Sequence, residues 1–509
     1  MADWHHPILS CRESIAYEKE FFGGDATQAA KAMESAGRAL GKAIWQETGR
    51  RLQLNPKVLL ILGKGHNAGD ALIACDELLR LHPEMEVDLL PVFGVEAMAP
   101  AIWPWYERVR GNASVRVLEI DQLQENMRQN YGLSIDGVFG MQFRLPLKDD
   151  LAELFELLNR HTIDVRVAVD LPSGVSDELS GTVLRADFTY ATGIFKALLC
   201  DPENRIACGR VRYLDLGFFE ERTRAEVKAR ILAPQLLSHA DALRPVSSDK
   251  RSYGHLLIVA GSRSMPGALL MTVQSALRSG VGLVTVVAPE SVSTTCCTQA
   301  PEAMWLPWAE TPRGGLALDG LLDLQAFGNK ISAVLMGPGV GTEPESHALL
   351  DGVCELFDGP FILDADALQE TRVTLLKRMG KSTILTPHEG EFRRIAGLSA
   401  SDTITDSIVE AFCRDSGAIV VLKGPLTNIA YEQARYFSPY GGPVLARGGS
   451  GDLLAGLIAG KVANPLILDL LESVAMGVVV HGRAADRLAS LKGETHIHTT
   501  EILDHLNPF

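Results

Sequence analysis

The stretch RGGSGDLLAGLIAG, residues 447–460, places a glycine-rich loop directly before an apolar run with helical character. Glycines let consecutive backbone N–H groups converge on an anion, and the N-terminal end of the following helix adds partial positive charge. Asp452 falls in the first turn, where it can cap the helix or face a group beside a bound phosphate. The loop alone therefore leaves two interpretations open, a phosphate site and an ordinary tight loop.

Composition narrows the class of protein. The chain has 509 residues, 46% of them hydrophobic and 22% charged, which is typical of globular α/β material of two or three domains. A net charge of −15 disfavours binding to nucleic acid or to anionic membranes. The eight cysteines form no CxxC pair, and the sequence shows no secretory signal or membrane-spanning run. We expect a cytoplasmic homo-oligomer that acts on small molecules.

Two successive series of buried strands predict two α/β domains. Strand-like runs separated by helical patterns favour parallel sheets covered on both faces. The first series comprises 57–63, 87–94, 165–170 and 188–193, with helical patterns at 68–82 and 149–161. The second comprises 255–262, 283–290, 333–341, 361–368, 382–391 and 418–430. A charged stretch at 220–232 has helical character, and we place the boundary within 225–245, giving domains 1–230 and 231–509.

Polar residues follow the strands of the second series. Ligands of open parallel sheets bind beyond the carboxyl ends of the strands, so these residues are the candidates for chemistry. Asp364 and Asp366 share one face if their strand continues, and could serve Mg²⁺ or a substrate, although one of them could simply cap a helix. The segment KGPLT, 423–427, offers Lys and Thr to a nucleotide, or forms a solvated turn.

Two more strand ends add to this set. In TPHEGE, 386–391, Thr386 could be an N-cap, Pro387 the first helical residue and Glu389 the end of a capping box. That cap leaves His388 unexplained, and we expect it to face the cleft. The loop GPGVG, 337–341, permits a close approach of the backbone to a ligand.

In this order, the segments SYGHLLIVAGS, PGALLMT, MGPGVG, LDADAL, TPHEGE, KGPLT and GGSGDLLAG resemble the ribokinase-like family of ADP/ATP-dependent NAD(P)H-hydrate dehydratases. The resemblance spans roughly residues 235–509 and implies a ribokinase-like α/β domain that uses ADP or ATP with Mg²⁺. It implies Asp452 as the catalytic base. It implies a hydrate site at Ala268, Gly339, Gly341 and His388, and a nucleotide site at Lys423, Gly424, Pro425, Leu426, Thr427 and Gly451.

The first domain carries a weaker dinucleotide signal. LGKGHNAGDA, 62–71, contains GxGxxA, but the next strand ends in Phe93 and Gly94 rather than in an acid, so ordinary NAD binding is not supported. Asp170 ends a buried strand and precedes a Pro-Ser-Gly turn, where it could merely cap a helix, and Lys196 lies just beyond another strand.

These residues resemble the NAD(P)H-hydrate epimerase domain over about residues 10–220, which implies a Rossmann-like three-layer fold. The family loop reads GNNGGDG where this chain reads GHNAGDA, and we expect the alanine methyls to hinder phosphate approach and slow epimerisation. The resemblance implies catalysis by Asp170 and Lys196. It implies K⁺ ligands at Asn67, Asp136 and Ser173, and substrate contacts at His66, Asn67, Ala68, Gly69, Asp70, Gly140, Met141, Gln142, Phe143, Arg144, Leu145 and Pro146.

The fusion resembles bifunctional NAD(P)H-hydrate repair enzymes, in which one domain prepares the substrate of the other. The expected activity interconverts the R and S hydrates of NADH and NADPH and dehydrates the S form at the expense of ADP or ATP. Two alternatives remain at this point. One is a small-molecule kinase, because a GGSGD loop on this fold also serves phosphorylation. The other is a dehydratase whose N-terminal domain is a non-catalytic binding module.

Overall fold

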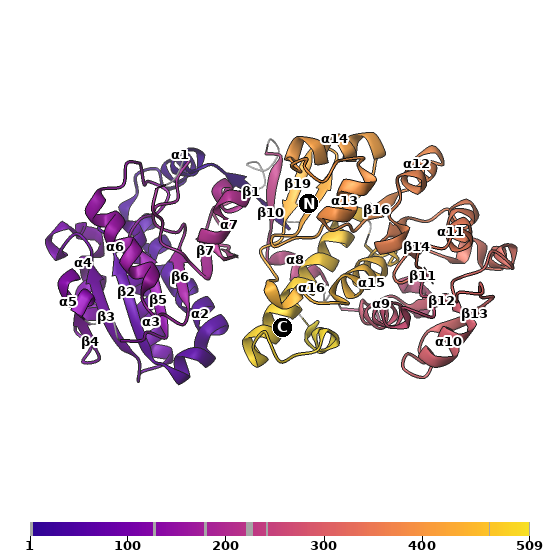
Figure 1. Ribbon diagram of the computed structural model, residues 1–509. Helices are drawn as coiled ribbons and strands as arrows, with labels where there is room; N and C mark the ends of the chain where they lie inside the picture. The colour runs from indigo at the N-terminus through magenta and orange to yellow at the C-terminus, as the bar shows by residue number, and fades with distance from the viewer. Residues whose placement is uncertain are drawn as a thin grey trace. The chain divides into compact units, whose positions relative to one another are not determined.

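The structure is a computed structural model that describes residues 4–125, 129–177, 181–219, 227–240, 243–467 and 469–507. The chain forms two compact units. One spans His6–Val227, and the other combines Lys228–Phe509 with the chain's first residues, ending at His5. Figure 1 draws the first unit in indigo to magenta and most of the second in magenta to yellow.

The unit His6–Val227 is built on a parallel seven-stranded sheet in the order β4-β3-β2-β5-β6-β7-β9. The strands are β2 (Lys57–Leu62), β3 (Glu86–Pro91), β4 (Val115–Val117), β5 (Leu133–Gly137), β6 (Arg166–Val169), β7 (Phe188–Thr192) and β9 (Arg210–Leu214). The order runs outward in both directions from the neighbours β2 and β5. This pair is the switch point, where ligands bind in doubly wound sheets.

Helices cover both faces of this sheet. The helices are α1 (Cys11–Phe22), α2 (Ala26–Leu54), α3 (His66–Leu81), α4 (Trp103–Arg110), α5 (Ile120–Glu125), α6 (Asp149–Arg160) and α7 (Arg205–Cys208). On one face Leu40 and Ile44 of α2 pack with α3 against the strands, and on the other Leu154 and Phe155 of α6 do so. The predicted Rossmann-like three-layer arrangement is confirmed.

The larger unit has strands in the order β13-β12-β11-β14-β15-β16-β17-β18-β19-β10. They are β10 (Ala229–Leu232), β11 (His255–Val259), β12 (Leu283–Pro289), β13 (Met304–Trp308), β14 (Ala333–Met336), β15 (Phe361–Leu363), β16 (Thr383–Leu385), β17 (Ile419–Leu422), β18 (Asn428–Tyr431) and β19 (Ala434–Phe437). β13 through β17 are parallel, whereas β17-β18 and β18-β19 are antiparallel. Its switch point lies between β11 and β14.

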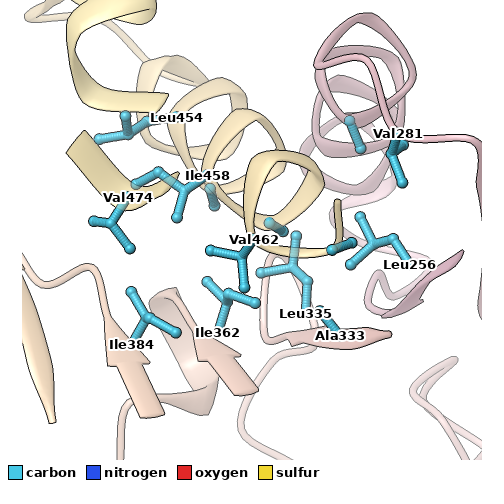
Figure 2. Close-up of a cluster of buried hydrophobic side chains, with 14 of the residues drawn as sticks. Leu256, Val281, Ala333, Leu335, Ile362, Ile384, Leu454, Ile458, Val462 and Val474 are labelled. Atoms are coloured by element: carbon cyan, nitrogen blue, oxygen red, sulfur yellow. The ribbon is translucent and has the colours of Figure 1, made fainter. Parts of the chain in front are cut away.

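Two helical layers enclose this sheet. The helices are α8 (Gln235–Ala240), α9 (Pro266–Arg278), α10 (Glu290–Cys296), α11 (Pro344–Leu356), α12 (Glu370–Arg378), α13 (Glu389–Ile395), α14 (Asp406–Ser416), α15 (Ser450–Val462) and α16 (Leu470–Lys492). Figure 2 shows Leu454, Ile458 and Val462 of α15 above Leu335 and Ile362 of the sheet. The helices α11 to α14 pack on the opposite face through a second apolar cluster. The predicted ribokinase-like α/β domain is confirmed.

Two sequence expectations about secondary structure differ from the structure. The run 418–430 is not one strand but a hairpin, because the Gly-Pro pair in KGPLT turns the chain between β17 and β18. The stretch 220–232 was expected to be helical. Its residues 220–226 lie outside the described residues, and Ala229–Leu232 form strand β10 beside β19. Pairing with β19 and burial of Ile231 and Leu232 override the helical spacing there.

The chain's N-terminal end contributes to the larger unit. The Trp4 ring stacks on Tyr436 with centroids 5.4 Å apart, and its carbonyl accepts a hydrogen bond from the Ala233 N–H. Trp4 is buried in the cluster that contains Leu232 and Leu236. A fragment beginning near residue 230 therefore lacks part of this core. Among the helices described, none is long and apolar enough to cross a membrane.

Candidate active sites

The switch point of the larger unit is lined by close-approach glycines. The Gly261 N–H donates to the Pro338 carbonyl at 2.9 Å, which joins the loops after β11 and β14. Gly339 has φ +66°, and a Cβ there would lie 2.8 Å from the Met265 carbonyl and 3.1 Å from the Ala268 Cβ. Ala268 and Gly339, which we assigned to one hydrate site, are therefore neighbours.

Asp364 and Asp366 do not lie on one face of a strand. β15 ends at Leu363, Asp364 is the N-cap of a 3₁₀ turn at Ala365–Ala367, and Ala365 has φ +50°. Asp366 turns instead toward the neighbouring loop, where it accepts a hydrogen bond of 2.9 Å from the Gly341 N–H. The strand was expected to continue, but it ends where the backbone enters the left-handed region.

Lys423 and Asp364 form the charged centre of this edge. Lys423 Nζ lies 2.9 Å from Asp364 Oδ1 and 3.8 Å from the Glu391 carboxylate. Thr386 donates its hydroxyl to the same Asp364 oxygen at 2.7 Å. Burial alone would lower the pKa of Lys423, but these carboxylates outweigh it and raise the pKa above its usual value. The lysine is therefore a fixed cation beside the loop that precedes α15.

His388 has a different role from the one its position suggested. It is itself the N-cap of α13, and its Nδ1 accepts hydrogen bonds from the Gly390 and Glu391 N–H groups. The Glu391 carboxylate completes the capping box by accepting from the His388 N–H at 2.8 Å. The expected cap at Thr386 is wrong because Thr386 points to Asp364. The His388 side chain is 60% exposed, and its Nε2 lies 3.5 Å from Glu391 Oε1.

The glycine-rich loop that begins at Arg447 leads into α15. Gly449 is the N-cap residue with φ +86°, and Asp452 stands in the first turn. A Cβ on Gly451 would lie 3.3 Å from Lys423 Nζ, so the lysine lies over the N-terminal end of α15. Burial raises the pKa of Asp452 to about 7, and the carboxylates of Asp364 and Asp366 add to the effect. A carboxyl with that pKa can take up a proton near neutral pH.

The remaining nucleotide candidates form the turn between β17 and β18. Gly424 and Pro425 are exposed and Leu426 and Thr427 half-buried, with the Thr427 hydroxyl donating to the Gly424 carbonyl at 3.4 Å. The turn follows Lys423 directly in the chain, so its exposed backbone lies next to the Lys423–Asp364 ion pair. This arrangement suits a phosphate chain or a ribose.

The smaller unit has a cavity of about 550 Å³ at the switch point of its sheet. Its lining combines the ends of β2, β5 and β6 with a residue of α1. Eleven of the candidate residues line it, namely His66, Asn67, Asp70, Gly140, Met141, Gln142, Phe143, Arg144, Pro146, Asp170 and Lys196. Glu18, which the sequence reasoning missed, lines it as well. Ala68, Gly69 and Leu145 are not part of this lining.

Asp170 and Lys196 meet in this cavity. The Lys196 ammonium ion-pairs with Asp170 Oδ1, and only 1% of the lysine side chain is exposed. Asp170 has φ +65°, the left-handed conformation, and its N–H donates to the Tyr190 carbonyl at 2.9 Å. Lys196 ends the short strand β8 (Phe195–Lys196), which pairs with Leu9 of β1 (His5–Leu9). A turn and a short strand thus fix the pair from two directions.

Asp136, Ser173 and Asn67 gather oxygen atoms beside the pair. Asp136 accepts from the Ser173 N–H at 2.8 Å and from the Ser173 hydroxyl at 2.7 Å. Asn67 Nδ2 donates to the Phe139 carbonyl at 2.8 Å, which turns its Oδ1 toward Gly140. Burial raises the pKa of Asp136 to about 6. These carboxylate, hydroxyl and amide oxygens are a donor set that fits a hard cation such as K⁺.

The altered loop affects the cavity less than its sequence suggests. The segment 66–71 opens α3, and the methyls of Ala68 and Ala71 are fully buried among the apolar residues between α2 and the sheet. Gly69 also faces inward, since a Cβ there would lie 2.6 Å from Met33 Sδ. The expected hindrance by alanine methyls is therefore wrong, because helical geometry turns these positions away from the ligand. His66 is the one departure that faces the cavity.

Glu18 is the functional candidate that motif reading did not find. It lies in the second half of α1, in the segment AYEKEFF, which matches none of the motifs named above. Only the packing of α1 brings it to the cavity. Its neighbour Asp70 has a buried Oδ1 with no hydrogen-bond partner among the described residues. Burial raises the pKa of Glu18 to about 7 and that of Asp70 well above its usual value.

Two α/β units, each with carboxyl and lysine side chains at the switch point of a parallel sheet, define an enzyme with two separate sites for small molecules. Within the described ranges, no group of three or more His, Cys, Asp or Glu residues that could hold a metal ion occurs.

Comparison with known proteins identifies the family. Residues 29–198 match the model of the YjeF-related protein N-terminus, and residues 256–508 match that of NAD(P)H-hydrate dehydratase. The bifunctional NAD(P)H-hydrate repair enzyme Nnr of Synechocystis is 31% identical over 89% of this chain and 86% of its own length. That of Coxiella burnetii is 31% identical over 92% and 93%. The chain belongs to the family of bifunctional NAD(P)H-hydrate repair enzymes.

One solved structure is similar to about half of this chain. The ADP/ATP-dependent NAD(P)H-hydrate dehydratase from Bacillus subtilis, co-crystallised with ATP and Mg²⁺, is 27% identical. It matches 54% of this chain and 95% of its own length with a TM-score of 0.45.

Proposed function

We propose that this enzyme restores hydrated NADH and NADPH, with its smaller unit interconverting the R and S hydrates and its larger unit dehydrating the S form. The observation that carries the proposal is the Asp452 carboxyl in the first turn of α15, beside Gly451 and the Lys423–Asp364 pair. It combines a base, an anion-binding helix end and a fixed cation, which are the parts that phosphoryl transfer to a hydroxyl requires.

Dehydration must remove a hydroxyl, and hydroxide is a poor leaving group. Asp452 takes the proton of the C6 hydroxyl, and the hydroxyl oxygen attacks the terminal phosphorus of ADP or ATP. Lys423 and the N–H groups at the start of α15 hold the transferred phosphoryl group. Phosphate then leaves as the ring nitrogen's lone pair forms a C6=N1 double bond, and loss of a C5 proton restores the 5,6 double bond and returns the electron pair to N1.

Each unit is proposed to use a different metal ion. Mg²⁺ shields the negative charge of the nucleotide phosphates, and Asp364 and Asp366 are the carboxylates at that edge of the sheet that could approach it. In the smaller unit, K⁺ held by Asn67, Asp136 and Ser173 neutralises the phosphates of the hydrate beside the loop that begins α3. The substrate-binding, nucleotide-binding and catalytic assignments of the individual residues are part of this proposal.

Epimerisation uses the cavity of the smaller unit. Asp170, paired with Lys196, exchanges a proton at the C6 hydroxyl, and Asn67 with His66 orients the phosphate end. The eight cysteines are all free thiols, which supports the reducing cytoplasm as the place of the reaction. The proposed partners are the hydrate and a nucleotide, in a homo-oligomer without nucleic acid or membrane.

The test separates this activity from that of a small-molecule kinase. Purified protein is mixed with the S hydrate, Mg²⁺ and either ADP or ATP, and the absorbance of the reduced ring is followed together with phosphate release. We expect restored NADH and one phosphate for each molecule consumed. A stable phosphorylated product with no restored NADH would identify a kinase instead and overturn the proposal.

A further inference from the structure

The helix α1 places one carboxyl in the cavity of the smaller unit. Tyr17 and Phe21 of α1 pack against Phe219 and Phe218 at ring-centroid distances of 5.1 Å. The Tyr17 hydroxyl also donates to the Phe218 carbonyl. These contacts hold one side of the helix, and Glu18, the residue between them, lines the cavity with Asp170 and Lys196.

Glu18 and Asp170 occupy different electrostatic environments within one cavity. Asp170 is ion-paired with Lys196. No hydrogen bond or ion pair joins Glu18 to another residue in the described part of the chain, and burial raises the pKa of its carboxyl to about 7, with Asp170 adding to the rise and Lys196 opposing it. Two carboxyls in different surroundings within one cavity are a recurring arrangement for acid–base catalysis.

The chemistry of epimerisation requires such a pair. Inverting C6 means that the hydroxyl leaves from one face of the ring and water returns to the other. One group must give a proton to the departing hydroxyl, and a second group must take a proton from the incoming water. Asp170 is held in place by Lys196 and by its backbone, so a single fixed carboxylate cannot serve both faces.

We propose that Glu18 is the second acid–base catalyst of the epimerase site, acting at the ring face opposite to Asp170. This inference rests on the proposed epimerisation and names a residue for it. Protonated Glu18 gives its proton to the C6 hydroxyl, the C–O bond breaks to release water, and the lone pair of N1 forms the C6=N1 double bond. A water molecule adds to the other face of C6, the electron pair returns to N1, and Asp170 takes the proton.

One turnover leaves the proton on Asp170, and the reverse reaction uses the same pair with the roles exchanged. Glu18 and Asp70 also line a second cavity of about 410 Å³, which leaves space for water beside Glu18 to restore the starting protonation state. Besides Glu18 and Asp170, the titratable groups that line the two cavities are Asp25, Lys64, His66, Asp70, Arg144, Lys148 and Lys196. The competent enzyme therefore carries one proton on the Glu18–Asp170 pair.

The test compares Glu18→Gln with Glu20→Gln, an exposed position on the same helix. Each variant is given the pure R hydrate with K⁺, and the reverse reaction is started from the S hydrate without nucleotide. We expect Glu18→Gln to slow both directions equally, by about 100-fold or more, since an enzyme cannot change the equilibrium constant. Glu20→Gln is expected to match the parent protein.

Two further readouts distinguish catalysis from a structural role. The Glu18→Gln variant should dehydrate the S hydrate at the parent rate and keep its thermal midpoint. The fall of the parent's epimerisation rate above pH 7, caused by loss of the Glu18 proton, should disappear in the variant. Glu18→Asp, which retains an acid one methylene shorter, should recover part of the rate.

Two results would overturn the inference in distinguishable ways. If the parent epimerises and Glu18→Gln does so within a factor of about three, Glu18 has no catalytic role and the proposed function stands. If the parent converts the R hydrate no faster than the uncatalysed reaction, the epimerase assignment fails together with this inference.

Discussion

Lys423 and Asp364 form an ion pair of 2.9 Å that spans an intervening strand. Asp364 follows β15 and Lys423 follows β17, while β16 lies between them in the sheet. Thr386, at the end of β16, donates to the same Asp364 oxygen. Three successive strand ends are thus tied together directly beneath the loop that precedes α15, so the site is fixed by the sheet.

Lys423→Met is expected to destabilise the larger unit by about 3 kcal/mol, because it leaves the buried Asp364 charge without its partner. Urea unfolding measures the change, with the exposed Lys330→Met as the matched control. The double variant with Asp364→Asn should recover part of the loss, since neither charge then remains. With Asp364→Asn also measured alone, a loss in the double variant equal to the sum of the two single losses would show that the two side chains do not interact energetically.

Asp452→Asn is expected to lower the dehydration rate by about 10²–10⁴-fold with nucleotide binding nearly unchanged, because the amide keeps the shape and removes the base. In the parent protein, the rate should rise as pH increases through about 7, where Asp452 loses its proton. Single-turnover measurements with the S hydrate check both points. A near-normal rate in the variant is incompatible with Asp452 as the base.

The same variant should be more stable than the parent at alkaline pH. The folded state raises the pKa of Asp452 from 3.8 to about 7, so it binds a proton more tightly than the unfolded chain does. The parent therefore loses stability as pH rises between these values, by about 4 kcal/mol at most. Asp452→Asn removes that loss. Unfolding free energies should coincide near pH 4 and differ at pH 8, and equal values at both would refute the prediction.

Ala68→Gly is expected to leave epimerisation unchanged and to lower stability by about 1 kcal/mol, because the methyl lies in the core at the start of α3. His66→Asn, by contrast, alters a side chain that faces the cavity and should change the KM for the hydrate. Steady-state kinetics of both variants, compared with the parent protein, measure these two effects on epimerisation. Faster epimerisation by Ala68→Gly would contradict this prediction and show that the Ala68 methyl hinders binding of the hydrate.

Much of both folds follows from the sequence because buried parallel strands are continuous apolar runs. Strands such as β2 and β11 lie within the predicted ranges. The hairpin at KGPLT differs because the Gly-Pro pair turns the chain there. The cap at His388 differs because Thr386 contacts Asp364, a residue of a distant segment. Glu18 could not be found from spacing at all, since only the tertiary packing of α1 brings it to the cavity.

The most direct measurement supplies the R hydrate alone, with K⁺, Mg²⁺ and ADP or ATP, and follows the absorbance of the reduced ring. Both units must then act in series. We predict that the parent protein restores NADH from the R hydrate, that Asp170→Asn does so only at the rate of spontaneous epimerisation, and that this variant works normally on the S hydrate. If the parent consumes the S hydrate but leaves the R hydrate untouched beyond that spontaneous rate, the smaller unit is a binding module and the account of a two-site repair enzyme is contradicted.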